Sequence, residues 1–124
     1  MIPSKTVREK AKRIQATVKF LGHNPQGGEV YGVQGDTGYH HVFVLRDDNK
    51  VIRCDCHSMT LCSHRLAVLR YRAAQRGASL VAFTRNEKHT VSFARALRAN
   101  PRFVDVAAKT VGGIYWVEAK RKAA

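Results

Sequence analysis

The sequence is poor in acidic residues. Nine Asp and Glu stand against 22 Lys and Arg, which gives a net charge of +13 at pH 7. An excess of one sign repels itself within a compact fold and most often serves a polyanionic partner. We therefore predict that the chain binds nucleic acid, and DNA rather than RNA. The alternative is that the positive charge only keeps the surface solvated.

Long apolar runs are also missing. No segment approaches the roughly 18 apolar residues that a membrane span needs. The chain begins with Met1-Ile2-Pro3-Ser4 and passes directly into a charged stretch, without the pattern of a secretory signal. We expect no membrane partner and an intracellular protein that is not secreted. It would be cytoplasmic, or nuclear if the source is a eukaryote.

The familiar motifs of catalytic sites are absent as well. The sequence has no Gly-rich phosphate loop, no nucleophile elbow and no second metal motif. The pair Asp47-Asp48 suits a hairpin turn better than an acid–base pair. We predict that the protein is not an enzyme. Spacing alone leaves open a metal-dependent nuclease that gathers carboxylates from distant positions.

Cysteine is scarce, but its placement is informative. The three cysteines are Cys54, Cys56 and Cys62, and a histidine, His64, follows one residue after the last of them. Three thiolates and one imidazole form a complete tetrahedral set for Zn²⁺. The first pair can project from the end of a strand and the second from the first turn of a helix. Because this set closes the coordination shell, we predict a structural rather than a catalytic zinc site.

This spacing, Cys-x-Cys followed by Cys-x-His at the head of an apolar helix, resembles the SWIM-type zinc finger. The resemblance covers roughly residues 30–76, including a β-hairpin before the first cysteine pair. It implies a zinc-bound ββα unit that binds DNA or protein. Residues 78–124 resemble no family that we can name.

Other interpretations of the cysteines are weaker. A disulfide would leave one cysteine over, and Cys54 and Cys56 are separated by a single residue, which is poor geometry for a bridge. A catalytic thiol needs one activated sulfur and a base rather than three thiols in one window. His57 is an alternative ligand in place of His64, although its position next to Cys56 makes coordination of the same metal awkward.

Periodicity predicts an α+β protein in three segments. Residues 1–16 form a basic N-terminal helix, with Thr6 or Ser4 as its cap. Residues 17–77 form an antiparallel β-meander followed by the zinc-knuckle helix. Residues 78–124 form a βαββ segment with a basic tail. The predicted strands span 17–21, 29–33, 39–45, 51–53, 79–83, 102–108 and 114–119, and the later helices span 65–76 and 84–99. We expect a capping box at Thr84 to open the last helix, with Val91, Ala94 and Leu97 on its buried side and Phe93 nearby.

Two groups of basic residues are candidates for contacts with nucleic acid. On the helix after His64, three arginines fall on one stripe, and a fourth precedes Cys54; the residues are Arg65, Arg72, Arg76 and Arg53. The N-terminal helix adds Lys5, Arg8 and Lys12. Guanidinium groups suit phosphates and guanine edges. The alternative is that these side chains are solvated or cover apolar surface with their stems.

A second function also fits the sequence. A small basic zinc module can dock on an acidic protein surface and use its metal only to hold its shape. The predicted alternative is therefore a protein–protein adaptor, of a kind that a phage or mobile element would encode.

Overall fold

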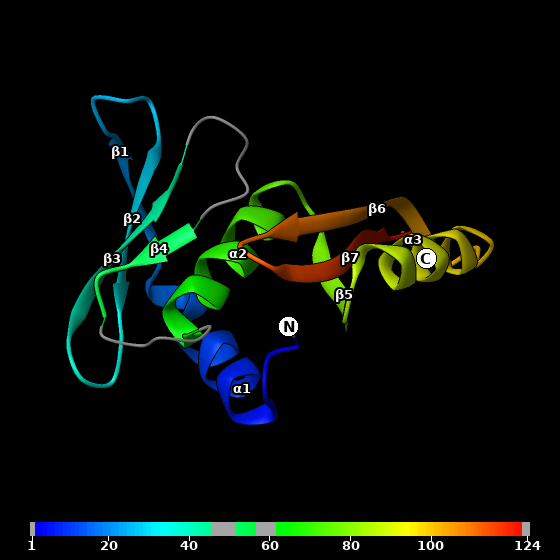
Figure 1. Ribbon diagram of the computed structural model, residues 1–124, viewed down its shortest axis with the longest axis horizontal. Coiled ribbons are helices and arrows are strands. Elements are labelled where there is room, and N and C mark those ends of the chain that lie inside the picture. Colours follow the sequence, from blue (N-terminus) through cyan, green and yellow to red (C-terminus); the bar gives the residue numbers. More distant parts are fainter. Residues whose placement is uncertain (1, 46–51, 57–61, 123–124) are drawn as a thin grey trace. The chain divides into compact units, whose positions relative to one another are not determined.

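The computed structural model describes residues 2–45, 52–56 and 62–122 (Figure 1). The chain forms two compact units, which we call the first unit (residues 3–71) and the second unit (residues 1–2 and 72–124). Both units contain helix and antiparallel sheet, so the predicted α+β class is confirmed. No helix among the described residues is long and apolar enough to cross a membrane.

The first unit is built on a four-stranded antiparallel sheet with the order β1-β2-β3-β4. Its elements are α1 (Lys5–Ile14), the 3-10 turn η1 (Gln15–Thr17), β1 (Lys19–His23), β2 (Glu29–Gln34), β3 (Tyr39–Val44), β4 (Ile52–Cys54) and the first part of α2 (Ser63–Gln75). The predicted meander is therefore present. Its predicted turn at 46–50 and the predicted strand residue Val51 lie outside the described residues.

One face of this sheet forms the core of the first unit. Side chains alternate between the two faces of a strand, and Val42 and Val44 of β3 are fully buried on the inner face. Helix α2 covers that face: Leu66 and Val68 are buried, and the rings of Tyr31 and Tyr71 meet edge to face at 6.0 Å. The inner face thus positions the start of α2 beside the end of β4.

Helix α1 begins two residues earlier than the capping box at Thr6 indicates. Ser4, the second of the two predicted caps, accepts a hydrogen bond from the Val7 N–H, so the capping box at Thr6 is not used. The helix passes into the η1 turn, where the Thr17 hydroxyl donates to the Ile14 carbonyl. This turn delays β1 by two residues relative to the predicted strand at 17–21.

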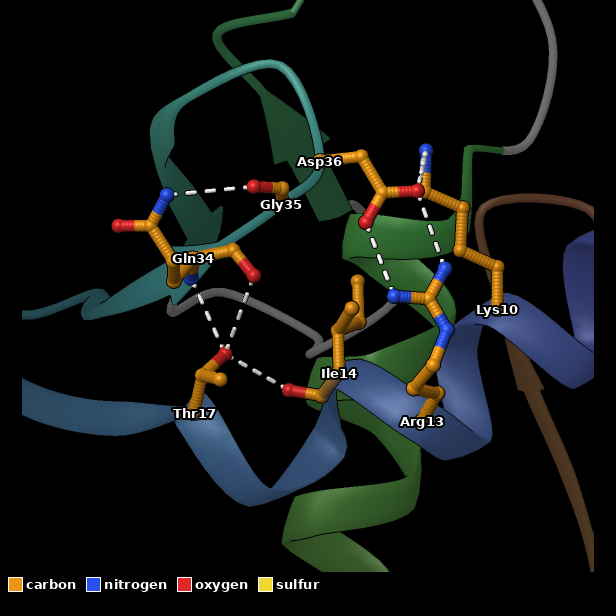
Figure 2. A network of polar contacts seen from close by, with 7 residues as sticks. All are labelled: Lys10, Arg13, Ile14, Thr17, Gln34, Gly35 and Asp36. Carbon is orange, nitrogen blue, oxygen red and sulfur yellow. Dashed lines mark hydrogen bonds and ion pairs between the residues drawn. The ribbon is translucent and has the colours of Figure 1, made fainter.

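The end of α1 is fastened to the turn between β2 and β3. Figure 2 shows Arg13 donating two hydrogen bonds to the carboxylate of Asp36, at 2.9 and 3.0 Å, with Lys10 at 3.5 Å from the same group. The Thr17 hydroxyl accepts from the Gln34 N–H at 3.0 Å. Because Arg13 binds the ionised form, the pKa of Asp36 is lowered to about 2. Two of the basic residues of α1 are therefore held by this turn.

The second unit contains the predicted βαββ segment. Its elements are β5 (Ser79–Thr84), α3 (Glu87–Arg98), β6 (Phe103–Val111) and β7 (Ile114–Arg121), and the sheet order is β5-β7-β6. Buried Ile114, Trp116 and Val117 make β7 the centre of this core. Glu118 is also buried, and Arg76 binds its two oxygens at 2.6 and 3.2 Å.

Helix α3 differs in detail from its prediction. Asn86 rather than Thr84 is the N-cap, since its side chain accepts from the His89 N–H, and the Thr84 hydroxyl instead pairs with Thr90. Thr90 and Ala94 are buried, whereas Val91, predicted to be buried, is 41% exposed. Ala94 is buried as predicted, while Thr90, whose hydroxyl pairs with that of Thr84, takes the buried position expected for Val91.

Candidate metal centre

Four donor side chains converge where β4 ends and α2 begins. Cys54 is the last residue of β4, Cys56 follows two residues later, Cys62 directly precedes α2, and His64 lies in its first turn. One donor atom from each residue lies within 4.8 Å of every other. All three cysteines are free thiols. The structure thus brings together the four residues that the sequence predicts as ligands, while His57 lies outside the described residues.

The surroundings of His64 fit a bound metal. This side chain is buried, and neither of its ring nitrogens has a hydrogen-bond partner among the residues that the structure describes. A buried polar group without a partner costs about 1–3 kcal/mol. A metal bond to one nitrogen would remove part of this cost. The donor set of three sulfurs and one imidazole is also the set that zinc favours.

The side chains of Cys54 and Cys62 interact directly. The Cys54 thiol donates a hydrogen bond to Cys62, which lowers the pKa of Cys62 and raises the pKa of Cys54. The backbone N–H of Arg65, at the start of α2, also donates to the Cys62 sulfur at 3.4 Å and lowers its pKa further. Both thiols must be deprotonated when they bind a metal, and the downward shift of its pKa favours this for Cys62.

Asp55, between the first two cysteines, fastens them to β3. Its carboxylate accepts from the His41 N–H at 3.0 Å and lies 2.9 Å from His40 Nδ1, and its own N–H donates to the His41 carbonyl. Desolvation raises the pKa of Asp55, but the hydrogen bonds from His41 and His40 outweigh it and the net shift is downward. The carboxylate therefore stays ionised and holds the Cys54–Cys56 loop in place.

His40 connects this brace to the ligand histidine. Its ring lies 4.1 Å from that of His64, measured between centroids, at an angle of 35°. His40, Cys54 and Asp55 also form a second group of close donor atoms. This group shares Cys54 with the Cys₃His cluster, and two of its members, His40 and Asp55, are already bound to each other. We therefore assign His40 to orienting Asp55 and His64 rather than to binding the metal itself.

Gly35 provides the space for His64. A Cβ atom at this position would collide with His64 Nε2, and the Gly35 N–H donates to the Gly38 carbonyl to close the turn. The turn is the one that α1 holds through Asp36 (Figure 2). Any side chain at position 35 would displace the imidazole, so Gly35 is required for its size rather than for an unusual φ.

The predicted nucleic-acid contacts differ in their environments. Lys5, Arg8 and Lys12 are exposed on α1, and Arg53 is exposed on β4. Arg65 of the first unit and Arg72 of the second are half-buried. Arg76 is engaged by the buried carboxylate of Glu118 and contributes to the second unit itself. Among these residues, Arg53 and the α1 group have the clearest access to an external anion.

Sequence reasoning missed three contributors to the site, namely Asp55, His40 and Gly35. A carboxylate between two predicted ligands was a usable signal, because the loops of metal sites are commonly braced by hydrogen bonds. Gly35 gave no such signal, because its neighbour in space lies 29 positions along the chain. No family model matches the sequence, and no curated protein or solved structure shows significant similarity to it.

Proposed function

We propose that this is a small non-catalytic protein that binds one structural Zn²⁺ through Cys54, Cys56, Cys62 and His64 and uses its basic surface to bind DNA. The observation that carries the proposal is the convergence of these four donors on one point. The ion would join the end of β4 to the start of α2. Four protein ligands close the tetrahedral shell, so no position is left for a substrate. The resemblance to SWIM-type fingers, which implies the same use, agrees with this assignment.

The case for DNA rests on charge. The net charge of +13 falls by only about one when three thiolates and one zinc ion are counted. Lys5, Arg8 and Lys12 present positive charge along α1, and Arg53 does so next to the metal centre. Release of counterions from DNA phosphates would drive such binding. The three free thiols suit a reducing compartment, which accords with a cytoplasmic or nuclear protein.

A salt series tests this proposal. Zinc-loaded protein should bind a fluorescently labelled duplex or single strand at about 50 mM salt and lose roughly 10³-fold or more in affinity by about 200 mM if several phosphates are contacted. Replacement of Lys5, Arg8 and Lys12 by Ser should weaken binding and flatten the slope of log K against log salt. A matched control removes three exposed basic residues of the second unit, namely Lys88 and Arg95 of α3 and Arg85 just before it.

The control distinguishes DNA binding by the α1 surface from binding that depends only on the total positive charge. If both triple variants reduce affinity and slope equally, the α1 surface is not the contact. If the wild-type protein binds neither DNA nor RNA at low salt, the nucleic-acid proposal fails. The adaptor would then be the better description, and its partner should bind with little dependence on Arg53 or the α1 cations.

A further inference from the structure

The face of the β1–β4 sheet opposite α2 carries a row of rings. Tyr39, His41 and Phe43 alternate with the buried residues of β3 and therefore point outward. The Tyr39 and His41 rings lie 5.4 Å apart and the His41 and Phe43 rings 6.5 Å apart, the latter pair nearly parallel at 24°. Side chains two positions apart on a strand are separated by about 6.8 Å. The distances between neighbouring rings thus follow from the two-residue repeat of the strand.

The neighbouring strand makes room for this row. Gly32 of β2 pairs with His41, and a Cβ atom on Gly32 would overlap the ring of Tyr39. The Tyr39 ring therefore lies across β2 above Gly32 instead of standing away from the sheet. Leu21 of β1 approaches the same position from the other side. A glycine inside a strand often marks a close approach of this kind.

These rings remain accessible. Tyr39 and Leu21 are both 49% exposed, the side chain of His41 is 45% exposed, and Phe43 is half-buried. In the first unit, α2 packs against the opposite face, through the Tyr31–Tyr71 and His40–His64 contacts. An exposed row of aromatic rings on a sheet is unusual without a partner, since large apolar side chains are normally buried.

The charge of this face indicates an anionic partner. Register places Lys19 opposite Gly32 and Arg53 opposite Phe43, so one cation lies on each outer strand and on the same face as the rings. Both are exposed. Among the residues of β1–β4 the only acidic one is Glu29, which pairs with buried Val44 and lies on the inner face, where the Tyr31 hydroxyl donates to it. Asp55, just after β4, lies 3.5 Å from the His41 ring, but its carboxylate is already engaged by His40 and by the His41 N–H.

We propose that this face binds single-stranded DNA, with bases stacked on Tyr39 and Phe43 and phosphates contacted by Lys19 and Arg53. The inference rests on the proposed DNA binding and specifies its strand class and its surface. Stacking requires exposed base faces, which a duplex hides, while every base of a single strand can offer one. A second copy of this chain, with a net charge of +13, would lack the negative charge that Lys19 and Arg53 complement. An acidic protein would offer that charge but no row of flat bases for the rings to stack on.

The test compares a labelled oligothymidylate of about 15 nucleotides, within the site sizes of single-strand-binding domains, with a duplex of equal length. The wild-type protein should prefer the single strand by at least about fivefold. Tyr39→Leu and Phe43→Leu should each weaken single-strand binding by roughly 5- to 150-fold and leave the salt slope unchanged, because they remove stacking without removing charge. Phe93→Leu, at a ring that is 41% exposed in the second unit, is the matched control and should have no effect.

Crosslinking of the unmodified protein makes the test independent of whether the variants fold. An oligonucleotide carrying 5-iododeoxyuridine should crosslink on irradiation to the peptide that contains Tyr39 and Phe43. Crosslinks confined to α1 or to the second unit would overturn the assignment of the surface. Tighter binding of the duplex, with Tyr39→Leu unaffected, would overturn this inference and leave the proposed function standing.

Three further outcomes would each overturn a different part of the account. Failure to bind either single strand or duplex would overturn the proposed function together with this inference. Concentration-dependent dimerisation that Tyr39→Leu abolishes, in a protein whose DNA affinity the substitution does not change, would assign the face to a second copy and overturn the inference alone. Tighter binding of an oligouridylate of equal length would overturn the assignment to DNA.

Discussion

The two units differ in how they accommodate buried polar groups beside their small sheets. The first unit places three sulfurs and an unpaired imidazole at the junction of β4 and α2, next to an apolar core. The second unit packs Ile114, Trp116 and Val117 into its core and places the buried carboxylate of Glu118 against Arg76. The charged groups of the ion pair bind each other within the chain. The ring nitrogens of His64, in contrast, have no hydrogen-bond partner among the described residues. The first unit should therefore depend on a ligand and the second should not.

Removal of the metal should produce the largest difference between the two units. Binding of structural zinc is worth roughly 10–16 kcal/mol, which is comparable with the whole stability of a domain. A strong chelator should therefore abolish the protection of amides in β3, β4 and the start of α2, while β5, β6 and β7 keep theirs. Hydrogen exchange measured by mass spectrometry distinguishes the units. Addition of zinc should restore protection, and equal loss in both units would refute the contrast.

Gly35→Ala should have the next largest effect. The added Cβ collides with His64 Nε2, so we expect zinc affinity to fall at least about tenfold, as it does when the support of a ligand is lost. Competition with a chromophoric chelator measures the affinity. Gly38→Ala is the control: its φ of +150° strains a side chain, but nothing lies within 4 Å. It should lower Tm without changing zinc affinity, and equal losses of affinity would show that the turn acts only through its backbone.

Arg76→Ala probes the second unit. Glu118 would remain buried without its partner, and we expect unfolding free energy to fall by roughly 1–3 kcal/mol, less than for a fully buried pair because the Arg76 side chain is 44% exposed. Denaturant unfolding of the zinc-loaded protein measures the change. Glu118→Gln in the same chain should recover part of the loss. If stability is unchanged and DNA affinity falls instead, Arg76 serves an external phosphate, as the sequence first indicated.

Asp36→Asn should have the smallest effect. The pKa of Asp36 in the folded protein, about 2, lies below its ordinary value, so the carboxylate stabilises the first unit above about pH 4, and this contribution is lost as pH falls towards 2. The variant should melt at a lower temperature than the wild type at pH 7, and the difference should shrink near pH 3. Lys5→Ala, which removes the 3.9 Å pair with Glu9, should leave Tm unchanged. A difference that grows in acid would contradict the sign of this linkage.

The features that could be predicted from the sequence are those determined by the spacing of residues close together in the chain. The spacing of Cys54, Cys56, Cys62 and His64 was sufficient to predict the cluster, because both pairs lie at the ends of regular elements. The periodicity of residues 39–45 likewise predicted the strand that the structure shows as β3. These signals need no knowledge of contacts between distant segments.

What sequence could not predict depends on such contacts. The choice of Ser4 over Thr6, and of Asn86 over Thr84, is decided by which hydroxyl finds another partner; Thr84 finds Thr90. The pairing of Arg76 with Glu118 joins residues 42 positions apart. The collision that Gly35 avoids exists only after α2 has packed against the sheet.

The central claim is that one zinc ion holds β4 to α2, and metal stoichiometry tests it most directly. Native mass spectrometry and elemental analysis of the protein purified under reducing conditions should give one zinc per chain, and Cys62→Ser should reduce this value sharply while Ser58→Ala leaves it unchanged. Protein with reduced thiols, no bound metal and no measurable affinity for zinc would contradict the account.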